Sequence, residues 1–278
     1  PKKIFEDRID DIRECIGCNI CVSGDMTMSP IRCTQNPAVG EEWRRGWHPE
    51  RIQGKNSDDR ILIVGAGPAG LEAARALGQR GYEVMLAECC RELGGRVTRE
   101  SRLPGLSTYA RVRDYRVQQL NVMPNVEIYR DSEMSASLIL EAECSLVALA
   151  TGAVWRRDGV GREHRIPIPG LDMLPVFSPD DVMNGENIPG PVVVYDDDHY
   201  YMGGVIAELL RAKDLEVTLV TSAPVVSVLA PAFLGGFFLR LFLAMGLPPA
   251  FEHHDGPQRV GVMPAARLVL TPQGLDGP

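Results

Sequence analysis

Ile61-Leu62-Ile63-Val64-Gly65-Ala66-Gly67-Pro68-Ala69-Gly70 is the segment of this sequence with the strongest structural signal. Its first four residues form an apolar run typical of a short buried strand, and the residues up to about Gln79 are typical of a helix. Between them stands the G-x-G-x-x-G pattern of dinucleotide-binding folds. Gly65 permits the tight turn, Gly67 lets backbone amides approach a pyrophosphate, and Gly70 allows the helix to pack closely on the strand.

The residues after this helix complete the predicted nucleotide site. Residues 84–87 are apolar and predict a second strand, which ends at Glu88, 18 residues beyond Gly70. A carboxylate there can accept hydrogen bonds from an adenosine ribose, and the alternative is a solvated carboxylate at a strand end. The order of strand, glycine loop, helix and strand favours adenine nucleotide binding. The candidate residues are Gly65, Ala66, Gly67, Pro68, Ala69, Gly70 and Glu88.

Two downstream motifs extend this site. Leu93-Gly94-Gly95-Arg96 and Ala150-Thr151-Gly152 resemble the glycine pair and the strand end of flavoproteins that carry two dinucleotide-binding domains. Each motif alone could be a simple loop or turn. Together with the first glycine loop they add Gly95 and Arg96 to the candidate cofactor-binding residues.

Four cysteines near the start of the chain indicate an iron–sulfur cluster. Cys15, Cys18 and Cys21 form C-x-x-C-x-x-C, and eleven residues separate them from Cys33. Three thiolates on one tight loop can each bind a different iron of a 4Fe-4S cluster, and the fourth closes the site. Zinc usually takes two well-separated pairs of ligands, so zinc or unligated thiols are the alternatives. We expect that no signal peptide precedes the loop and that the protein lies in a reducing, cytoplasmic compartment, which disfavours disulfides.

The remaining cysteines carry no such pattern. Cys89, Cys90 and Cys144 lack ligand spacing, and we expect ordinary core or near-surface thiols.

Composition limits the function classes. The chain has 278 residues, 45% of them hydrophobic, and a formal charge of −8, which predicts a soluble protein of about two domains. An acidic balance argues against nucleic acid as a partner. Residues 223–239 carry no charge, but Pro224, Pro231 and Gly235-Gly236 would break a spanning helix, so we expect no membrane insertion.

A second nucleotide-type fold is predicted without its glycines. Residues 191–195 and 216–220 read as buried strands and residues 202–213 as the helix between them, but the turn reads Asp196-Asp197-Asp198-His199-Tyr200-Tyr201. Carboxylates at a helix start can occupy the donors that would hold a pyrophosphate, and they would repel it. We therefore expect no NAD(P)H here. A metal site formed by this turn is the alternative, although consecutive residues rarely converge on one ion.

These observations predict an α/β protein with four parts. We expect an iron–sulfur segment and linker at 1–57, an adenine-nucleotide-binding Rossmann-like domain at 58–155, which the family resemblance described below specifies as ADP- or FAD-binding, and a degenerate NAD(P)-like domain at 156–222. Residues 223–278 form an atypical tail, with six charged residues in fifty-six and no lysine, to which we assign no element. In this interpretation the second fold is degenerate and the C-terminal part incomplete.

The motifs together resemble the iron–sulfur flavoprotein amine dehydrogenases, the group of the trimethylamine, dimethylamine and histamine dehydrogenases. The resemblance runs from about residue 8 to about residue 222. It includes the cysteine loop, residues 41–50 (Glu-Glu-Trp-Arg-Arg-Gly-Trp-His-Pro-Glu), the glycine fingerprint and the turn at 196–203 (Asp-Asp-Asp-His-Tyr-Tyr-Met-Gly), which looks most like that of the dimethylamine branch. We expect Trp43 and Trp47 to pack the cysteine loop onto the nucleotide fold.

The resemblance implies a role in electron transfer. In this family an N-terminal barrel carries FMN, and electrons pass through the 4Fe-4S cluster to an electron-transferring flavoprotein while bound ADP takes no part in redox chemistry. This chain has no barrel, so it offers no catalytic residue, and its expected partners are an FMN-bearing barrel domain, that flavoprotein and copies of itself. The alternatives are an FAD-binding module of the dienoyl-CoA reductase type and a non-catalytic nucleotide-binding remnant.

Overall fold

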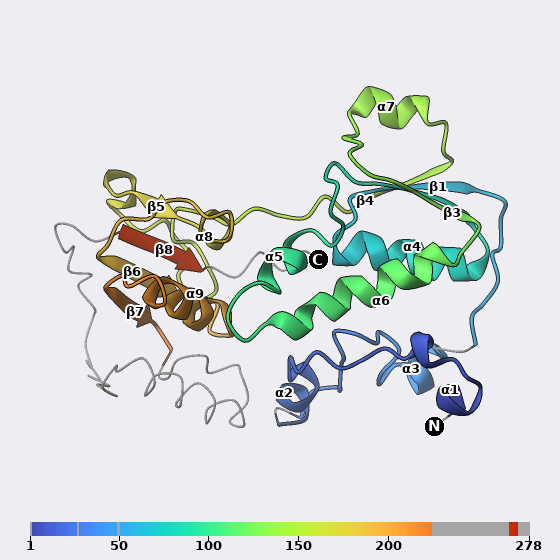
Figure 1. The fold of residues 1–278 in the computed structure, drawn as a ribbon, viewed down its shortest axis with the longest axis horizontal. Coiled ribbons are helices and arrows are strands. Elements are labelled where there is room, and N and C mark those ends of the chain that lie inside the picture. The colour runs from blue at the N-terminus through green and yellow to red at the C-terminus, as the bar shows by residue number, and fades with distance from the viewer. Residues whose placement is uncertain (1, 27, 49–50, 224–266, 272–278) are drawn as a thin grey trace. The chain divides into compact units, whose positions relative to one another are not determined.

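The computed structural model describes residues 2–26, 28–48, 51–223 and 267–271. The chain divides into two compact units, residues 1–152 and 153–278, coloured blue through green and yellow through red in Figure 1. Among the described residues, no helix combines the length and the apolar character needed to cross a membrane.

The first unit is built on a parallel sheet of four strands. Its strands are β1 (Arg60–Val64), β2 (Glu83–Ala87), β3 (Val126–Tyr129) and β4 (Leu146–Leu149), in the order β3-β2-β1-β4. Ile61 pairs with Val84 on one side and with Leu146 on the other, so β1 lies inside the sheet. The α/β fold and the Rossmann-like parallel sheet predicted from the sequence are confirmed.

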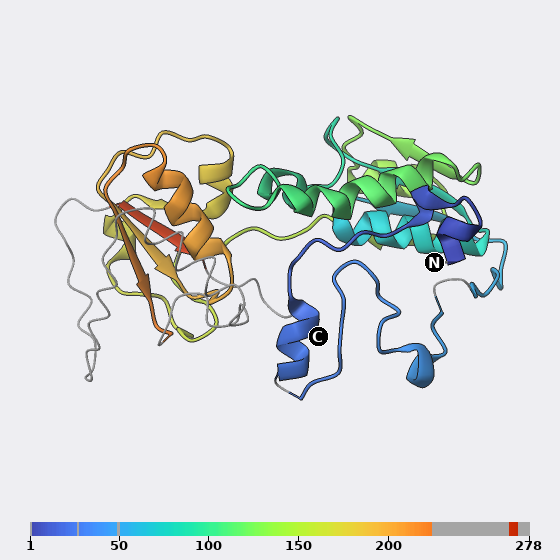
Figure 2. The same cartoon turned by 60° about the horizontal axis from the view of Figure 1, so that its bottom comes forward.

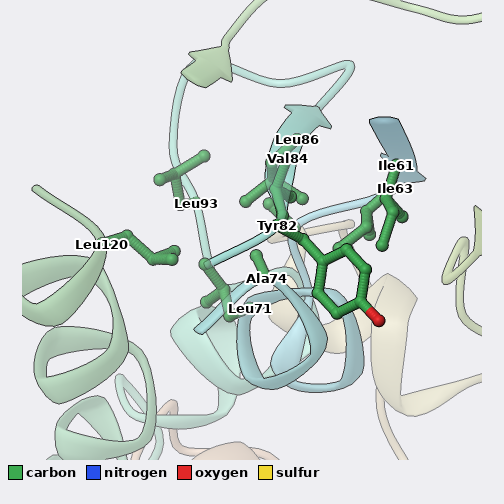
Figure 3. Close-up of a cluster of buried hydrophobic side chains, with 10 residues drawn as sticks. Ile61, Ile63, Leu71, Ala74, Tyr82, Val84, Leu86, Leu93 and Leu120 are labelled. Atoms are coloured by element: carbon green, nitrogen blue, oxygen red, sulfur yellow. The ribbon is translucent and has the colours of Figure 1, made fainter. Parts of the chain in front are cut away.

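Helices cover both faces of this sheet. Helices α4 (Pro68–Arg80) and α6 (Ala110–Asn121) pack on one face and α7 (Ala136–Glu141) on the other (Figure 1). Side chains alternate along β1, so Ile61 and Ile63 meet Leu71 and Ala74 of α4 in one core (Figure 3), whereas Leu62 and Val64 face the layer of α7. Residues 61–64 of β1 are buried on both faces of the sheet, which agrees with their continuous apolar sequence.

The N-terminal segment consists of short helices joined by extended chain. They are α1 (Lys2–Phe5), the 3-10 turn η1 (Ile9–Asp11), α2 (Ile20–Met26) and α3 (Glu42–Arg45). Figures 1 and 2 show this segment as the blue chain beside α4 and α6. It packs against α5 (Arg96–Glu100), the 3-10 turn η2 (Ser107–Tyr109) and α6 through Ile16, which lies in one cluster with Val97 and Val112.

The second unit carries its own parallel sheet. The strands β5 (Val176–Phe177), β6 (Val192–Asp196), β7 (Val217–Thr221) and β8 (Arg267–Thr271) follow the order β5-β8-β6-β7. Helix α9 (Met202–Arg211) connects β6 to β7, as the sequence predicts. The unit also holds the 3-10 turn η3 (Leu171–Met173) and α8 (Pro179–Met183).

One element was missed in the tail. We assigned no structure to residues 223–278, yet residues 267–271 form β8 and pair with both β5 and β6. This segment, Arg267-Leu268-Val269-Leu270-Thr271, has only three apolar residues and carries a weak local signal, and its position between two strands is set by pairing with distant residues. Residues 224–266 and 272–278 of that tail lie outside the described residues.

Candidate functional site

The glycine loop has the geometry that its sequence predicts. Gly65 has φ of 101°, and a Cβ there would lie 2.5 Å from the carbonyl oxygen of Ala150 at the end of β4. A Cβ at Gly70 would lie 1.8 Å from the carbonyl oxygen of Gly65, so the start of α4 touches the turn. At Gly67 no atom lies within 4 Å of that position. The first and third glycines therefore serve packing, and the second opens onto free space.

Helix α4 points its N-terminus at this space. Gly67 is its N-cap, Pro68 occupies the first turn, and that turn contains no acidic residue. The first amides of a helix have no acceptor within the helix, and the helix dipole favours an anion there. Pro68 and Ala69 are exposed. The loop therefore presents backbone donors to solvent where a pyrophosphate would lie.

A second glycine loop closes against the first. The amide of Gly94 donates to the carbonyl oxygen of Ala66 at 2.8 Å. A Cβ at Gly95, which has φ of 56°, would lie 3.2 Å from Cα of Gly67. Arg96 begins α5 and is half-buried. The structure therefore brings Gly95 beside the glycine fingerprint, with Arg96 next to it in the chain.

Glu88 is tied to the same loop. It is 7% exposed, and its Oε2 accepts a hydrogen bond from the amide of Ala66 at 2.7 Å. Its Oε1 accepts one from the amide of Cys90 at 3.0 Å. The alternative of a solvated carboxylate is therefore wrong. Because a carboxylate offers about four acceptor positions, Glu88 keeps capacity for a ribose hydroxyl.

Two thiols follow this carboxylate directly. Cys89 and Cys90 are exposed, and their Sγ atoms lie 3.6 Å apart. Cys89 Sγ lies 3.2 Å from Oε1 of Glu88, and this hydrogen bond raises the pKa of Cys89 to about 12. The expectation that these thiols are near-surface is confirmed.

The cysteine loop is anchored on the nucleotide fold. Ile16 is 4% exposed and inserts between Val97 and Val112. Its carbonyl oxygen accepts a hydrogen bond from the hydroxyl of Thr108 at 3.0 Å, and Arg111 donates to the carbonyl oxygen of Cys15 at 2.7 Å. The loop between the first two cysteines is thus held at its backbone and at one side chain.

The four candidate ligands lie at or near the surface of this loop. Cys15 and Cys21 are exposed, and Cys18 and Cys33 are half-buried; all four are free thiols. The amide of Gly17 donates to Cys15 Sγ at 3.3 Å. Cys18 Sγ lies 3.1 Å from the hydroxyl of Thr34, which brings the segment of Cys33 to the loop.

The spacing of these thiols bears on the zinc alternative. Among the described residues, no three of these sulfurs lie within 4.8 Å of one another. Two sulfurs bound to one zinc at about 2.3 Å lie about 3.8 Å apart in a tetrahedral site, so this arrangement does not fit a single ion. A cubane spreads its four ligands over four irons, and four free thiols are the donor set that it requires.

A buried charge network fastens the cysteine segment to helices α4 and α6. Glu72 contacts Nη2 of Arg75 at 2.6 Å and Nε of Arg116 at 2.7 Å. Nη1 of Arg116 donates to Oε1 of Gln35 at 2.9 Å, and Arg13 donates to the carbonyl oxygen of Gln35. Sequence reasoning missed this network because its members lie on segments far apart in the chain.

The network shifts the pKa of its central carboxylate. Burial raises the pKa of Glu72, but the hydrogen bond from Arg75 and the charges of Arg75, Arg116 and Arg13 outweigh burial, so its pKa lies below the ordinary value. Burial is also the main reason that the pKa of Arg116 is lowered. Glu72 is therefore ionised when the segment is docked.

The two tryptophans of the cysteine segment do not hold it in place. Trp43 is 84% exposed and Trp47 is 47% exposed, although Arg45 stacks over the Trp47 ring at 4.9 Å. The expectation that Trp43 and Trp47 pack the loop onto the nucleotide fold is wrong in this structure. Ile16 and the Glu72 network hold the segment instead.

The acidic turn of the second unit is closed by its own groups. Asp196 Oδ1 accepts the amides of Asp198 at 3.2 Å and His199 at 3.3 Å. Asp197 is fully buried, and its Oδ2 accepts the amide of Glu163 at 3.1 Å. Burial, together with the charge of Asp196, raises the pKa of Asp198 to about 6. As the sequence predicts, a carboxylate occupies the amides of the turn.

The alternative of a metal site on this turn finds no geometric support. Within the described ranges, no three ligand atoms of Asp196, Asp197, Asp198 and His199 lie within 4.8 Å of one another. Consecutive side chains leave a turn in different directions, so their carboxylates do not meet.

A surface cavity of about 530 Å³ lies beside α6. Its lining includes Glu92, Arg113, Val117 and Arg130. It also includes Leu93 of the second glycine loop but none of the candidate cofactor-binding residues.

Comparison with known proteins identifies the family to which this chain is related. A family model for NAD(P)-binding Rossmann-like domains matches residues 63–129. Dimethylamine dehydrogenase of a Hyphomicrobium species is 41% identical over 256 residues, covering 89% of this chain and 35% of that protein.

Two solved structures agree with this relative. Histamine dehydrogenase from Rhizobium sp. 4-9 has a TM-score of 0.83 and 51% identity over 97% of this chain and 39% of its own. The 6-hydroxypseudooxynicotine amine oxidase of Pseudomonas geniculata has a TM-score of 0.84 and 44% identity over 97% of this chain and 38% of its own. The chain thus spans just over a third of the length of these relatives. It belongs to the amine dehydrogenase family of oxidoreductases and corresponds to a portion of those proteins.

Proposed function

We propose that this chain is the electron-transfer portion of an iron–sulfur flavoprotein amine dehydrogenase. It holds a 4Fe-4S cluster on Cys15, Cys18, Cys21 and Cys33, and an ADP molecule on the glycine loop. The observation that carries the proposal is the docking of the cysteine loop on the nucleotide fold through Ile16 and the carbonyl oxygen of Cys15. This contact makes the thiol quartet and the glycine loop parts of one unit.

The cysteine loop is suited to a redox centre. A 4Fe-4S cluster, when bound, supplies reversible one-electron transfer. The chain contributes the four thiolates and the amide of Gly17, which donates to Cys15 Sγ at 3.3 Å. Hydrogen bonds to ligand sulfurs stabilise negative charge on them and raise the reduction potential of the site.

The glycine loop is suited to ADP. The first turn of α4 offers its amides to a diphosphate, and Glu88 offers acceptors to the ribose. Neither group carries out redox chemistry, so the nucleotide would brace the fold rather than carry electrons. FAD is the alternative ligand of the same loop.

The second unit is proposed not to bind NAD(P)H. Asp196 and Asp197 already accept the amides of Asp198, His199 and Glu163. A diphosphate would have to displace these contacts and would meet buried carboxylates, at a cost of about 4 kcal/mol per charge pair at 4 Å and an effective dielectric of 20. Electrons would then enter from a flavin and not from a nicotinamide.

The rest of the machinery would come from sequence outside this chain. Large apolar side chains of the cysteine segment are exposed, among them Phe5, Met28 and Trp43. We propose that an FMN-bearing barrel covers this surface, that the full-length protein forms homo-oligomers in the cytoplasm, and that an electron-transferring flavoprotein accepts the electrons. Burial of these side chains against a partner would remove their apolar surface from water.

The test is anaerobic analysis of the purified chain. Iron and acid-labile sulfide should each reach about four per chain, with a reversible one-electron signal by electron paramagnetic resonance, and extraction should release ADP. Extraction of FAD would favour the alternative ligand. A redox-silent metal, or protein without iron after reconstitution, would leave only a nucleotide-binding remnant.

A further inference from the structure

Glu88, Cys89 and Cys90 form a compact set of possible metal ligands. The proposed function assigns a role to Glu88 but none to the two thiols. One carboxylate oxygen of Glu88 and the two sulfurs lie within 4.8 Å of one another. The carboxylate is buried and fixed by the amides of Ala66 and Cys90, whereas both thiols face solvent. The set is therefore preorganised on one side and accessible on the other.

Two of the three distances between these donors are close to those around a single soft ion. The two sulfurs lie 3.6 Å apart, and Cys89 Sγ lies 3.2 Å from Oε1 of Glu88. Tetrahedral zinc with bonds of about 2.3 Å to sulfur and about 2.1 Å to oxygen places sulfurs about 3.8 Å apart and sulfur about 3.6 Å from oxygen. Shifts of a few tenths of an ångström would satisfy both values.

A disulfide between Cys89 and Cys90 is disfavoured by the geometry of neighbouring residues. Consecutive Cα atoms across a trans peptide lie about 3.8 Å apart, below the range of about 4.4 to 6.8 Å in which disulfides form without strain. A bridging ion needs no sulfur–sulfur bond. The pair is thus better suited to share a ligand than to oxidise.

We propose that Glu88, Cys89 and Cys90 form a binding site for a soft or borderline divalent cation of the class of Zn²⁺ and Cd²⁺, with solvent completing the coordination, and that a bound ion competes with the nucleotide for Glu88. Each thiol releases its proton to solvent as its sulfur binds the ion, and no electron is transferred. The competition rests on the nucleotide site proposed above, whereas the ion site does not.

Cadmium titration of the full chain, with its iron–sulfur cluster in place and without oxygen, tests the ion site. Cd²⁺ is followed by thiolate-to-cadmium absorption and by calorimetry in the native chain, in Cys89→Ser/Cys90→Ser, and in the control Cys144→Ser. The native chain and the control should bind one more Cd²⁺ than the double variant. Equal stoichiometry and equal absorption in all three would overturn the site.

A measurement on the unmodified chain keeps the test independent of how the variants fold. The ¹¹³Cd resonance should fall between those of four-sulfur and all-oxygen sites. A four-sulfur shift would show that the added ion enters the other cysteines and would also overturn the proposal.

Competition between the ion and the nucleotide is tested by measuring the apparent Kd of ADP with and without Zn²⁺. At ten times its own Kd, Zn²⁺ should raise the apparent Kd of ADP about tenfold in the native chain and leave it unchanged in the double variant. An unchanged ADP affinity in native protein that holds the ion would overturn the competition. Failure of ADP to bind at all would instead refute the proposed nucleotide site, and the cadmium data alone would then decide the ion site.

Discussion

Replacing Ile16 with alanine should release the cysteine loop and leave the nucleotide fold intact. Ile16 is 4% exposed and contacts Val97 and Val112. Truncating a buried isoleucine to alanine costs about 2 to 5 kcal/mol. The cluster around Ile16 is small and separate from the core of the sheet, so it can collapse partly and the cost should lie near the lower end, at about 2 to 3 kcal/mol.

The expected loss of stability in Ile16→Ala can be converted into a change in amide hydrogen exchange. At 1.4 kcal/mol for each factor of ten, this loss should raise the local opening equilibrium of residues 12–36 about 30- to 140-fold. Amide hydrogen exchange followed by mass spectrometry should show that acceleration in the loop and little change in β1 and α4.

A matched control lies in the same segment. Ile12 is 37% exposed, so Ile12→Ala should change exchange by less than about threefold, because surface substitutions usually alter stability by no more than about 0.5 kcal/mol. Unaltered exchange in the loop of Ile16→Ala would refute the view that this side chain anchors it. Equal acceleration throughout the first unit would show that the loop and the nucleotide fold are not separable.

The other predictions concern the glycine loop, the charge network and the cluster. Gly70→Ala should lower the melting temperature, because its Cβ would lie 1.8 Å from a carbonyl oxygen, whereas Gly67→Val should mainly weaken ADP binding. Calorimetry of both variants distinguishes these outcomes. A Gly67→Val variant with a lowered melting temperature and normal ADP affinity would contradict them. Since the pKa of Glu72 is lowered in the folded state, its contribution to stability is present above its unfolded pKa of about 4.3 and is lost as pH falls through the folded value. Loop exchange at pH 3 to 6, corrected for its intrinsic rate, should therefore rise towards acid in the native chain, and a similar rise in Glu72→Gln would count against this carboxylate as the cause. Cys21→Ala should lose the cluster, as measured by iron content, and a variant with full iron would contradict the ligand assignment.

The first dinucleotide fold could be read from the amino-acid sequence because its signals are local. The apolar run of β1, the spacing of Gly65, Gly67 and Gly70, and Glu88 at the end of β2 all lie within about thirty consecutive residues. Each reflects a constraint on a single turn or strand end: a positive φ, a close backbone approach, or a period of burial. Such constraints select residue types at these positions independently of where other segments of the chain fold.

The contacts that assemble the site depend on folding. Arg116 meets Gln35 across 81 positions, and Arg111 meets the carbonyl oxygen of Cys15 across 96. Nothing in either local sequence marks its partner, because an arginine on a helix reads as a solvated charge until a second segment covers it. Strand β8 is likewise defined by the two strands between which it pairs. Residue patterns thus encode the parts, whereas burial and long-range pairing place the cysteine loop on the fold.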